Sequence, residues 1–404
     1  MQSFRSLDDA DVKAKRVLVR VDFNVPMADG EVADVSRIER NMPTITEIAD
    51  RGGKVILLSH YGRPKGRDPR ESLKPVVAAV ARILGRPIDF AEDCIGAVAE
   101  QAVAAMQPGD ILCLENTRFH AGEESNSRDF AKQLAALGDV YVDDAFSVAH
   151  RAHASVEAIG HLLPTYAGRA MQQELEALEQ ALHAPQRPVA AIVGGAKIST
   201  KLDLLGNLMT KVETLIIGGA MANTFLAAQG NAVGKSLRET DLIPTARAIM
   251  AKAKSLGRHL VLPVDAVVAQ KFAAHVPARV VAVDAVGPAD IILDIGPRSI
   301  AQAISVLARA KTLVWNGPFG AFEYEPFDNG TIEVAEAAAE LTADGRLVSI
   351  AGGGDTMAAL NAAGVTDRFT YVSTAGGAFL EWLEGKTLPG VEVLKAAACN
   401  TVRA

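Results

Sequence analysis

Short runs of apolar and β-branched residues recur along this chain, each followed by a glycine-rich or polar loop and then by a helical pattern. Several runs have no alternating polar positions, which is typical of strands buried on both faces of a parallel sheet. Alanine-rich stretches between them, such as 73–84 and 332–341, would form the crossover helices. The pattern predicts an α/β fold with strands at 17–21, 55–58, 111–114, 140–142, 189–193, 215–217, 260–262, 291–293, 313–315, 347–350 and 371–372.

The length of 404 residues favours two domains, because single cores rarely grow to this size. A helix-forming stretch at 168–182 ends at the proline-containing segment 184–188, and this helix is the expected connection between the domains. We therefore expect two Rossmann-like domains joined by a hinge helix, each with a parallel sheet flanked by helices. The expected bounds are 1–170 and 171–387, followed by a C-terminal segment at 388–404.

Charge and composition exclude several classes of protein. A net charge of −7 and an aromatic content of 5% argue against nucleic-acid binding, which needs basic and stacking surfaces. The widely spaced Cys94, Cys113 and Cys399 form no CxxC pair, so neither a disulfide framework nor a zinc ribbon is expected, in keeping with a reducing cytoplasm. No run of eighteen uncharged apolar residues and no apolar signal-peptide core occurs, so no membrane association is expected.

Basic side chains follow the expected strands of the first half. In parallel sheets the loops after the strands converge on one edge, where ligands bind. Guanidinium groups suit phosphate and carboxylate oxygens because they pair with them bidentately. The first half is thus expected to carry an anion site with Arg37, His60, Arg63, Arg118, His150 and Arg151.

Glycines follow the strands of the second half instead. Glycine allows close approach of the backbone, and amides at a helix start can hold phosphates. Lys197 and Lys201 are four residues apart and would share one face of a helix. This pattern is typical of a nucleotide site, and the loops that form it are 194–201, 218–221, 316–320, 352–356 and 374–377.

Three other interpretations of the sequence are disfavoured. The segment 230–236 imitates a P-loop but is one residue short and follows a helix rather than a strand. No GxGxxG fingerprint follows the first strand, which weakens a nicotinamide-dependent dehydrogenase as an alternative. His150 and His153 have no partner cysteine or acidic ligand at suitable spacing, so a metal site there is disfavoured.

Seven segments, taken together and in order, resemble phosphoglycerate kinases. The similarity extends from about residue 16 to residue 390. Any one segment is a weak signal, whereas seven in sequence are specific. The segments are 20–26 (RVDFNVP), 59–64 (SHYGRP), 115–119 (ENTRF), 144–153 (DAFSVAHRAH), 194–197 (GGAK), 315–318 (WNGP) and 352–356 (GGGDT).

The resemblance implies that the first domain binds phosphoglycerate. Asp22, Phe23 and Asn24 would lie at the glycerate hydroxyl and carboxylate. The 3-phosphate would be held by His60, Arg63, Arg118, Arg151 and the backbone of Tyr61 and Gly62. The C-terminal segment 388–404 would pack back on this domain, and the protein would be a cytoplasmic monomer that acts in glycolysis.

The resemblance also implies that the second domain binds MgADP or MgATP. Asp355 would hold Mg²⁺ and Glu323 would bond the ribose. Ala375 stands where a third consecutive glycine is expected, and it would be strained by roughly 1 kcal/mol if that position needed a positive φ. Phe319 is bulkier than the aliphatic residue expected beside the adenine. The other nucleotide-binding residues implied are Lys201, Gly218, Gly219, Asn316, Gly353, Gly354 and Thr356.

The resemblance implies phosphoryl transfer from 1,3-bisphosphoglycerate to ADP and its reverse, and the charge layout predicts that this transfer is direct and in line. A carboxylate and a phosphate oxygen are ionised at neutral pH, so the reaction needs positioning and charge neutralisation and no general base. The expected catalytic groups are Arg37, Lys197, the amides of Gly376 and Gly377, and Mg²⁺. A non-catalytic anion-binding protein of this fold is the remaining alternative, but it would be expected to lack Lys197 or Asp355.

Overall fold

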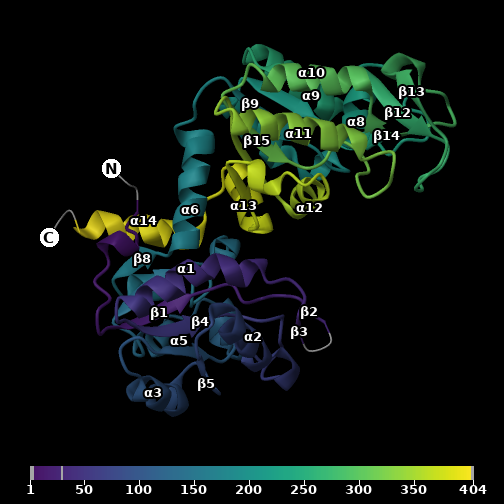
Figure 1. The fold of residues 1–404 in the computed structure, drawn as a ribbon. Helices are drawn as coiled ribbons and strands as arrows, with labels where there is room; N and C mark the ends of the chain where they lie inside the picture. The colour runs from purple at the N-terminus through teal and green to yellow at the C-terminus, as the bar shows by residue number, and fades with distance from the viewer. Residues whose placement is uncertain (1–3, 29–30, 402–404) are drawn as a thin grey trace. The chain divides into compact units, whose positions relative to one another are not determined.

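A computed structural model describes residues 4–28 and 31–401. The chain forms two compact units; in Figure 1 the first is coloured purple to teal except for its yellow C-terminal segment, and the second runs from teal to yellow. Unit 1 comprises the chain up to Leu175 together with the segment from Thr387 onward, and unit 2 comprises Glu176–Lys386. The change from one unit to the next falls inside helix α6 (Arg169–Leu178), a few residues after the expected bound.

Unit 1 contains a six-stranded parallel sheet in the order β5-β6-β4-β1-β7-β8. Its central strand β1 pairs on both sides, with Val17 opposite Val55 on β4 and opposite Val140 on β7. The four runs expected in the first half are therefore confirmed as parallel strands. The short edge strands β5 and β8 were not expected. The bounds are β1 Arg16–Arg20, β4 Lys54–Leu58, β5 Asp89–Ala91, β6 Ile111–Leu114, β7 Val140–Asp143 and β8 Thr165–Ala167.

Alternate residues of the central strands face different helices. Val17 and Val19 pack in one apolar cluster with α1 and α2, whereas Leu18 packs with α3 and α5 in another. Figure 1 shows α1 and α5 on opposite faces of this sheet. The other elements are a hairpin, β2 (Met27–Ala28) with β3 (Glu31–Val32), and the helices α1 Ser36–Asp50, α2 Lys74–Leu84, α3 Gly96–Ala105, α4 Ala121–Glu124 and α5 Arg128–Ala135.

The last helix, α14 (Pro389–Thr401), belongs to unit 1. The amide of Gly390 donates to the carbonyl of Ala149 at 2.9 Å. The apolar side chains of α14 at Val391, Val393 and Leu394 are buried. Burial of this apolar face is the physical reason that the C-terminal segment stays with the first unit.

Unit 2 contains a second six-stranded parallel sheet, in the order β11-β10-β9-β15-β16-β17. Trp315 and Leu313 on β15 pack in its core with apolar side chains of α10 and α11. No helix in the described part of the chain is long and apolar enough to cross a membrane. The bounds are β9 Val189–Val193, β10 Thr214–Ile217, β11 His259–Val261, β15 Thr312–Asn316, β16 Val348–Gly352, β17 Tyr371–Ser373, α7 Leu202–Lys211, α8 Met221–Ala228, α9 Ile243–Ser255, α10 Pro297–Leu307, α11 Asn329–Ala343, α12 Gly354–Ala362 and α13 Gly376–Leu383.

One expected strand of unit 2 lies outside the parallel sheet. The run at 291–293 forms β14 (Ile291–Ile295), which pairs antiparallel with β12 (Asp265–Ala269), and β12 also pairs with β13 (Ala278–Ala282). The first three residues of β14 are only half-buried. A short apolar run looks alike in the sequence whether it joins a parallel or an antiparallel sheet. The expectation that 291–293 would lie in the parallel sheet was therefore wrong.

Candidate functional site

Four basic side chains come together at the carboxyl end of the unit 1 sheet. Arg20 ends β1, His60 follows β4, Arg118 lies in a 3-10 turn (Thr117–Phe119) after β6, and Arg151 follows β7. The pKa of His60 lies well below its usual value because the ring is buried and because the three arginines are nearby. The fold thus gathers positive charge at one place on an acidic protein.

Arg20 was not among the expected site residues, yet it determines the state of His60. Its side chain is fully buried, and Nη2 lies 3.0 Å from Nδ1 of His60. A guanidinium group only donates hydrogen bonds, so Nδ1 must accept. The neutral ring therefore carries its proton on Nε2. An arginine that ends an otherwise apolar strand was the one sequence signal for this role.

A buried carboxylate balances the charge of Arg20. Arg20 Nε donates to Ser155 Oγ at 3.0 Å, and that hydroxyl donates to Glu123 Oε1 at 2.6 Å. The amide of Ser155 donates to the other oxygen of Glu123 at 3.0 Å. Glu123 itself is fully buried. This chain of bonds holds Arg20, and through it His60, in one orientation.

Arg118 is a buried cation with an unsatisfied donor. The side chain is 3% exposed, Nη1 donates to the carbonyl of Gly62 at 2.6 Å, and Nε lies 3.3 Å from a carboxylate oxygen of Glu124. Nη2 has no hydrogen-bond partner among the described residues. Burial and the nearby Arg151 lower the pKa of Arg118. An unpaired buried donor beside like charges is costly, so the site is suited to an anion.

A second group of polar side chains surrounds Asp22. Arg37 Nη1 donates to Asp22 Oδ2 at 2.9 Å and to the carbonyl of Asn24 at 3.1 Å. The hydroxyl of Ser147 also donates to Asp22 Oδ2, at 2.5 Å. Asn24 Oδ1 accepts from the amide of Gly62 at 3.0 Å. Asp22, Asn24, Arg37 and Gly62 are thus connected by hydrogen bonds. Ser147 joins them, although no sequence motif predicts its role.

Three other expected substrate-binding residues are placed less directly. The Phe23 side chain is buried in the core, so only its backbone is available to a ligand. Arg63 is exposed and makes no hydrogen bond or ion pair with any described residue. The amide of Tyr61 donates to Asn116 Oδ1 at 3.1 Å. Asn24, Tyr61 and Gly62 line a hollow of about 490 Å³ on unit 1.

The glycine loops of unit 2 pack directly against one another. Gly219 has φ +68°, and a Cβ placed there would lie 2.5 Å from the amide nitrogen of Gly195. Gly317 has φ +98°, and its Cβ would lie 2.2 Å from the carbonyl oxygen of Gly194. A Cβ on Gly218 would lie 2.7 Å from the ring of Phe319. These contacts leave no room for a larger residue.

Lys201 is tied into the same loops. Its Nζ donates to Asn316 Oδ1 at 2.6 Å, and Asn316 Nδ2 donates to the carbonyl of Gly352 at 2.7 Å. Burial lowers the pKa of Lys201, and this effect is opposed by the nearby carboxylates of Glu384 and Asp355. The hydroxyl of Thr356 accepts from the Gly317 amide at 2.7 Å and donates to the carbonyl of Gly352. Its hydrogen bonds therefore connect the loops to one another.

A cavity of about 520 Å³ opens beside these loops in unit 2. Gly219, Glu323 and Asp355 line it, as does Phe319. Phe319 is buried and packs edge to face on Trp315, with ring centroids 5.7 Å apart. An apolar wall with a few polar groups at its rim is the usual form of a small-molecule site.

The remaining expected residues of unit 2 lie at loop and helix ends. Lys197 is exposed after β9, and Gly376 and Gly377 begin α13. Ala375 has φ −88°, a conformation open to any residue, so the strain considered for this position is absent. Gly353 precedes α12 with φ +104°, and Gly354 is its first residue.

The donor set of unit 2 fits a magnesium ion that is bound with a nucleotide. Asp355 is exposed and lines the cavity. Mg²⁺ usually keeps several waters and is held by one or two carboxylates together with substrate phosphates. A single carboxylate beside the glycine loops therefore meets its needs.

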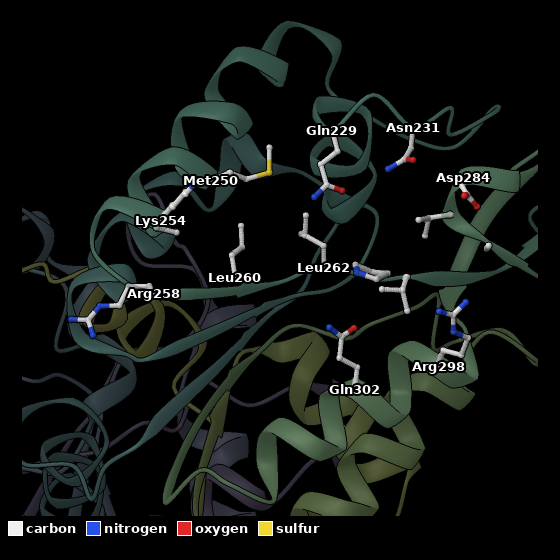
Figure 2. A pocket seen from close by; sticks show the side chains of 15 residues that line it. Gln229, Asn231, Met250, Lys254, Arg258, Leu260, Leu262, Asp284, Arg298 and Gln302 are labelled. Carbon is white, nitrogen blue, oxygen red and sulfur yellow. The ribbon is translucent and has the colours of Figure 1, made fainter.

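A separate hollow of about 740 Å³ lies on unit 2 near α9, β11 and the start of α10 (Figure 2). Apolar Leu260 and Leu262 line it together with the exposed cations Lys254 and Arg298. Pro263 lines both this hollow and the smaller cavity. None of the expected site residues lines the larger hollow, so it is not the candidate nucleotide site.

Comparison with known proteins agrees with these features. The family model described as phosphoglycerate kinase matches residues 7–386. The phosphoglycerate kinase of Azorhizobium caulinodans is 64% identical over 395 residues, which cover 98% of this chain and all of the relative. That of Bradyrhizobium diazoefficiens is 62% identical over 392 residues, with 97% and 98% coverage. The structure of phosphoglycerate kinase from Coxiella burnetii superposes with a TM-score of 0.91 at 42% identity, covering 97% of this chain and 99% of that one. This chain belongs to the phosphoglycerate kinase family of phosphotransferases.

Proposed function

We propose that this chain transfers a phosphoryl group reversibly from 1,3-bisphosphoglycerate to ADP, giving 3-phosphoglycerate and ATP, the glycolytic reaction of its family. The observation that carries the proposal is the buried, unpartnered Nη2 of Arg118 beside His60 and Arg151. A phosphate would supply the missing acceptor and the missing negative charge together.

In unit 1, the phosphorylated glycerate binds at the carboxyl end of the sheet. His60 donates from Nε2, since its Nδ1 is occupied by Arg20. Arg118 donates from Nη2, and Arg63, Arg151 and the Tyr61–Gly62 backbone complete the phosphate site. Asp22, Asn24 and the Phe23 backbone hold the glycerate hydroxyl and carboxylate.

In unit 2, the nucleotide occupies the cavity of about 520 Å³. Glu323 bonds the ribose, and Gly218, Gly219 and Asn316 form the wall. The phosphates lie at Lys201 and at the start of α12, where the backbones of Gly353, Gly354 and Thr356 present amides at the positive end of a helix. Asp355 holds Mg²⁺, which when bound neutralises charge on the phosphate oxygens.

The chain's own contribution to the chemical step is positioning and charge neutralisation. Both reacting oxygens are ionised at neutral pH, so no general base is required. Arg37 from unit 1, Lys197 from unit 2 and the amides of Gly376 and Gly377 are the groups that stabilise the transferring phosphoryl group.

Substrates that bind on different units can react only if the units bring them together. We therefore infer a hinge closure that requires both substrates, with bending in the 168–182 helix and near Thr374. Small-angle scattering should show a smaller radius of gyration with both ligands than with either one. Equal values in all states would exclude closure. A cytoplasmic monomer is proposed from the family alone.

The direct test of the reaction is a coupled assay for ATP formed from ADP and 1,3-bisphosphoglycerate. The intact chain with Mg²⁺ should make ATP, and removal of Mg²⁺ by a chelator should abolish turnover. A dehydrogenase or a non-catalytic anion-binding protein would make none.

A further inference from the structure

A cluster of three potential metal ligands lies in unit 1, and none of the three belongs to the proposed substrate sites. Asp93 and Cys94 follow β5, and His120 follows the 3-10 turn that contains Arg118. One ligand atom from each of the three side chains lies within 4.8 Å of the others. His120 Nε2 is 2.7 Å from Asp93 Oδ1.

We propose that Asp93, Cys94 and His120 form a binding site for a divalent transition-metal ion of the zinc class. A sulfur, a nitrogen and an oxygen donor suit a borderline metal such as Zn²⁺, whereas Mg²⁺ and Ca²⁺ prefer oxygen alone. Metal–ligand bonds of about 2.0–2.3 Å in a tetrahedral site place ligand atoms roughly 3.3–3.8 Å apart. Small shifts of the three side chains would reach that spacing, with solvent as the fourth ligand.

Neighbouring groups already orient two of the ligands. The second carboxylate oxygen of Asp93 is 3.1 Å from Nη1 of Arg67, and the Cys94 amide donates to Asp93 Oδ1 at 2.7 Å. The His120 ring stacks on Phe130 with centroids 5.3 Å apart. Such supporting contacts fix ligand geometry in metal sites. The charge of Arg67 opposes that of a cation, so binding should be reversible rather than structural.

The cluster is open to an ion from one side. His120 is 29% exposed and Asp93 27%, whereas Cys94 is fully buried. On binding, the Cys94 S–H bond breaks, the sulfur keeps the electron pair and bonds the metal, and the proton leaves to solvent. The proton on His120 Nε2 moves to Nδ1, so that Nε2 can bind the metal.

Cobalt(II) provides a direct probe, because a thiolate bound to Co²⁺ gives a charge-transfer absorption in the near ultraviolet. The full chain carrying Cys399→Ala, which removes an exposed thiol, is stripped with a chelator and titrated with Co²⁺. We expect one equivalent to bind with this absorption, and Zn²⁺ to abolish it by displacement. Absence of the absorption would overturn the proposal.

Three further variants locate the site. Cys94→Ser should lose the absorption, and His120→Gln should weaken Co²⁺ binding by about tenfold or more. Cys113→Ser is the matched control, because Cys113 is a buried thiol of the same unit in the core cluster on the other face of the sheet. It should keep the absorption. An absorption that persists in Cys94→Ser, or that is lost only in Cys113→Ser, would contradict the assignment. Circular dichroism confirms that each variant is folded. If Cys94→Ser or His120→Gln is not folded, Asp93→Asn takes its place and should weaken Co²⁺ binding, because it removes another ligand of the site.

Discussion

Arg20 and His60 show how a buried ion can set the chemistry of a neighbouring residue. Because the guanidinium occupies Nδ1 of His60, the ring presents a donor rather than an acceptor on its other nitrogen. Burial and the surrounding arginines keep the ring neutral by lowering its pKa. A neutral donor can therefore bond a phosphate oxygen at neutral pH.

This tautomer can be observed directly. In protein labelled with ¹⁵N-histidine, His60 should carry its proton on Nε2 at pH 7 and stay neutral well below pH 6.5, its ordinary pKa. The His60→Gln variant assigns the signal. A proton on Nδ1, or a charged ring at pH 7, would show that Arg20 does not have this role.

His153 makes the stability of unit 1 depend on pH. Burial, followed by the charges of Arg118 and Arg20, lowers its pKa from 6.5 to about 4. Between these values the unfolded chain binds a proton that the folded chain does not, so stability falls as the pH drops from 6.5 towards 4. At pH 5 this ring alone should lower the unfolding free energy of unit 1 by about 2 kcal/mol.

Between pH 7 and pH 5, the unfolding free energy of unit 1 should therefore fall by about 2 kcal/mol less in the His153→Gln variant than in the parent. Hydrogen exchange of β1 and β7 in urea reports the unfolding free energy of this unit. Equal pH dependence in the parent and the variant would mean that His153 titrates normally.

Arg37 is the unit 1 residue proposed to act in the chemical step. Its replacement by alanine should lower kcat roughly a hundredfold, about 3 kcal/mol, as expected for loss of one transition-state contact. Arg82→Ala is the control, because Arg82 lies on α2 and forms only an exposed ion pair with Glu31. Exposed ion pairs contribute little to stability. Steady-state kinetics should give kcat for both variants and for the parent. A kcat within a few-fold of the parent for Arg37→Ala would refute the proposed role.

At the scale of elements, the long buried strands could be predicted from the sequence, as could the edge strands β11 and β17 of unit 2, whereas the short strands β5, β8 and β13 could not. β1, β4, β9 and β15 are buried almost throughout, so their apolar runs are continuous. β5 has only one fully buried residue, and β13 has none. Half-exposed edge strands need few apolar residues, which leaves little pattern to recognise.

The candidate site was predictable where it follows strands and not where it depends on side-chain packing. Strand order places His60, Arg118 and Arg151 at one edge. The bond from Arg20 to Ser155 joins residues 135 positions apart, and the bond from Ser155 to Glu123 joins residues 32 positions apart, so no local pattern reveals them. The fourth expected cation, Arg63, remains exposed, because a loop arginine has no packing to direct it.

The loop before α12 depends on one glycine conformation. Gly353 has φ +104°, and a Cβ there would lie 2.7 Å from Asn316 Nδ2. Gly353→Ala should cost roughly 1 kcal/mol or more in stability, displace Asn316 from Lys201, and raise KM for the nucleotide. Gly206→Ala, in the open middle of α7, should be neutral or slightly stabilising. Thermal unfolding measures the stability of both variants, and steady-state kinetics measure their KM for the nucleotide. Equal stability and equal KM in the two variants would contradict the proposed role of the Gly353 conformation.

At the scale of the molecule, the proposed function gives each unit its own phosphate-binding chemistry. Unit 1 would use cationic side chains that follow four parallel strands, and unit 2 would use backbone amides at helix starts together with Lys201. The C-terminal helix α14 closes unit 1, so that unit is built from both ends of the chain. Each proposed substrate site lies within one unit, and each substrate should therefore bind alone.

Calorimetric titration of each substrate separately is the most direct test of this division. Arg118→Met should weaken 3-phosphoglycerate binding by about tenfold or more and leave MgADP binding unchanged, because a charge-assisted bond of at least 1.5 kcal/mol is lost in one unit only. Lys201→Met should do the reverse. If either variant weakened both ligands equally, or if Arg118→Met left 3-phosphoglycerate binding intact, the assignment of one substrate to each unit would be contradicted.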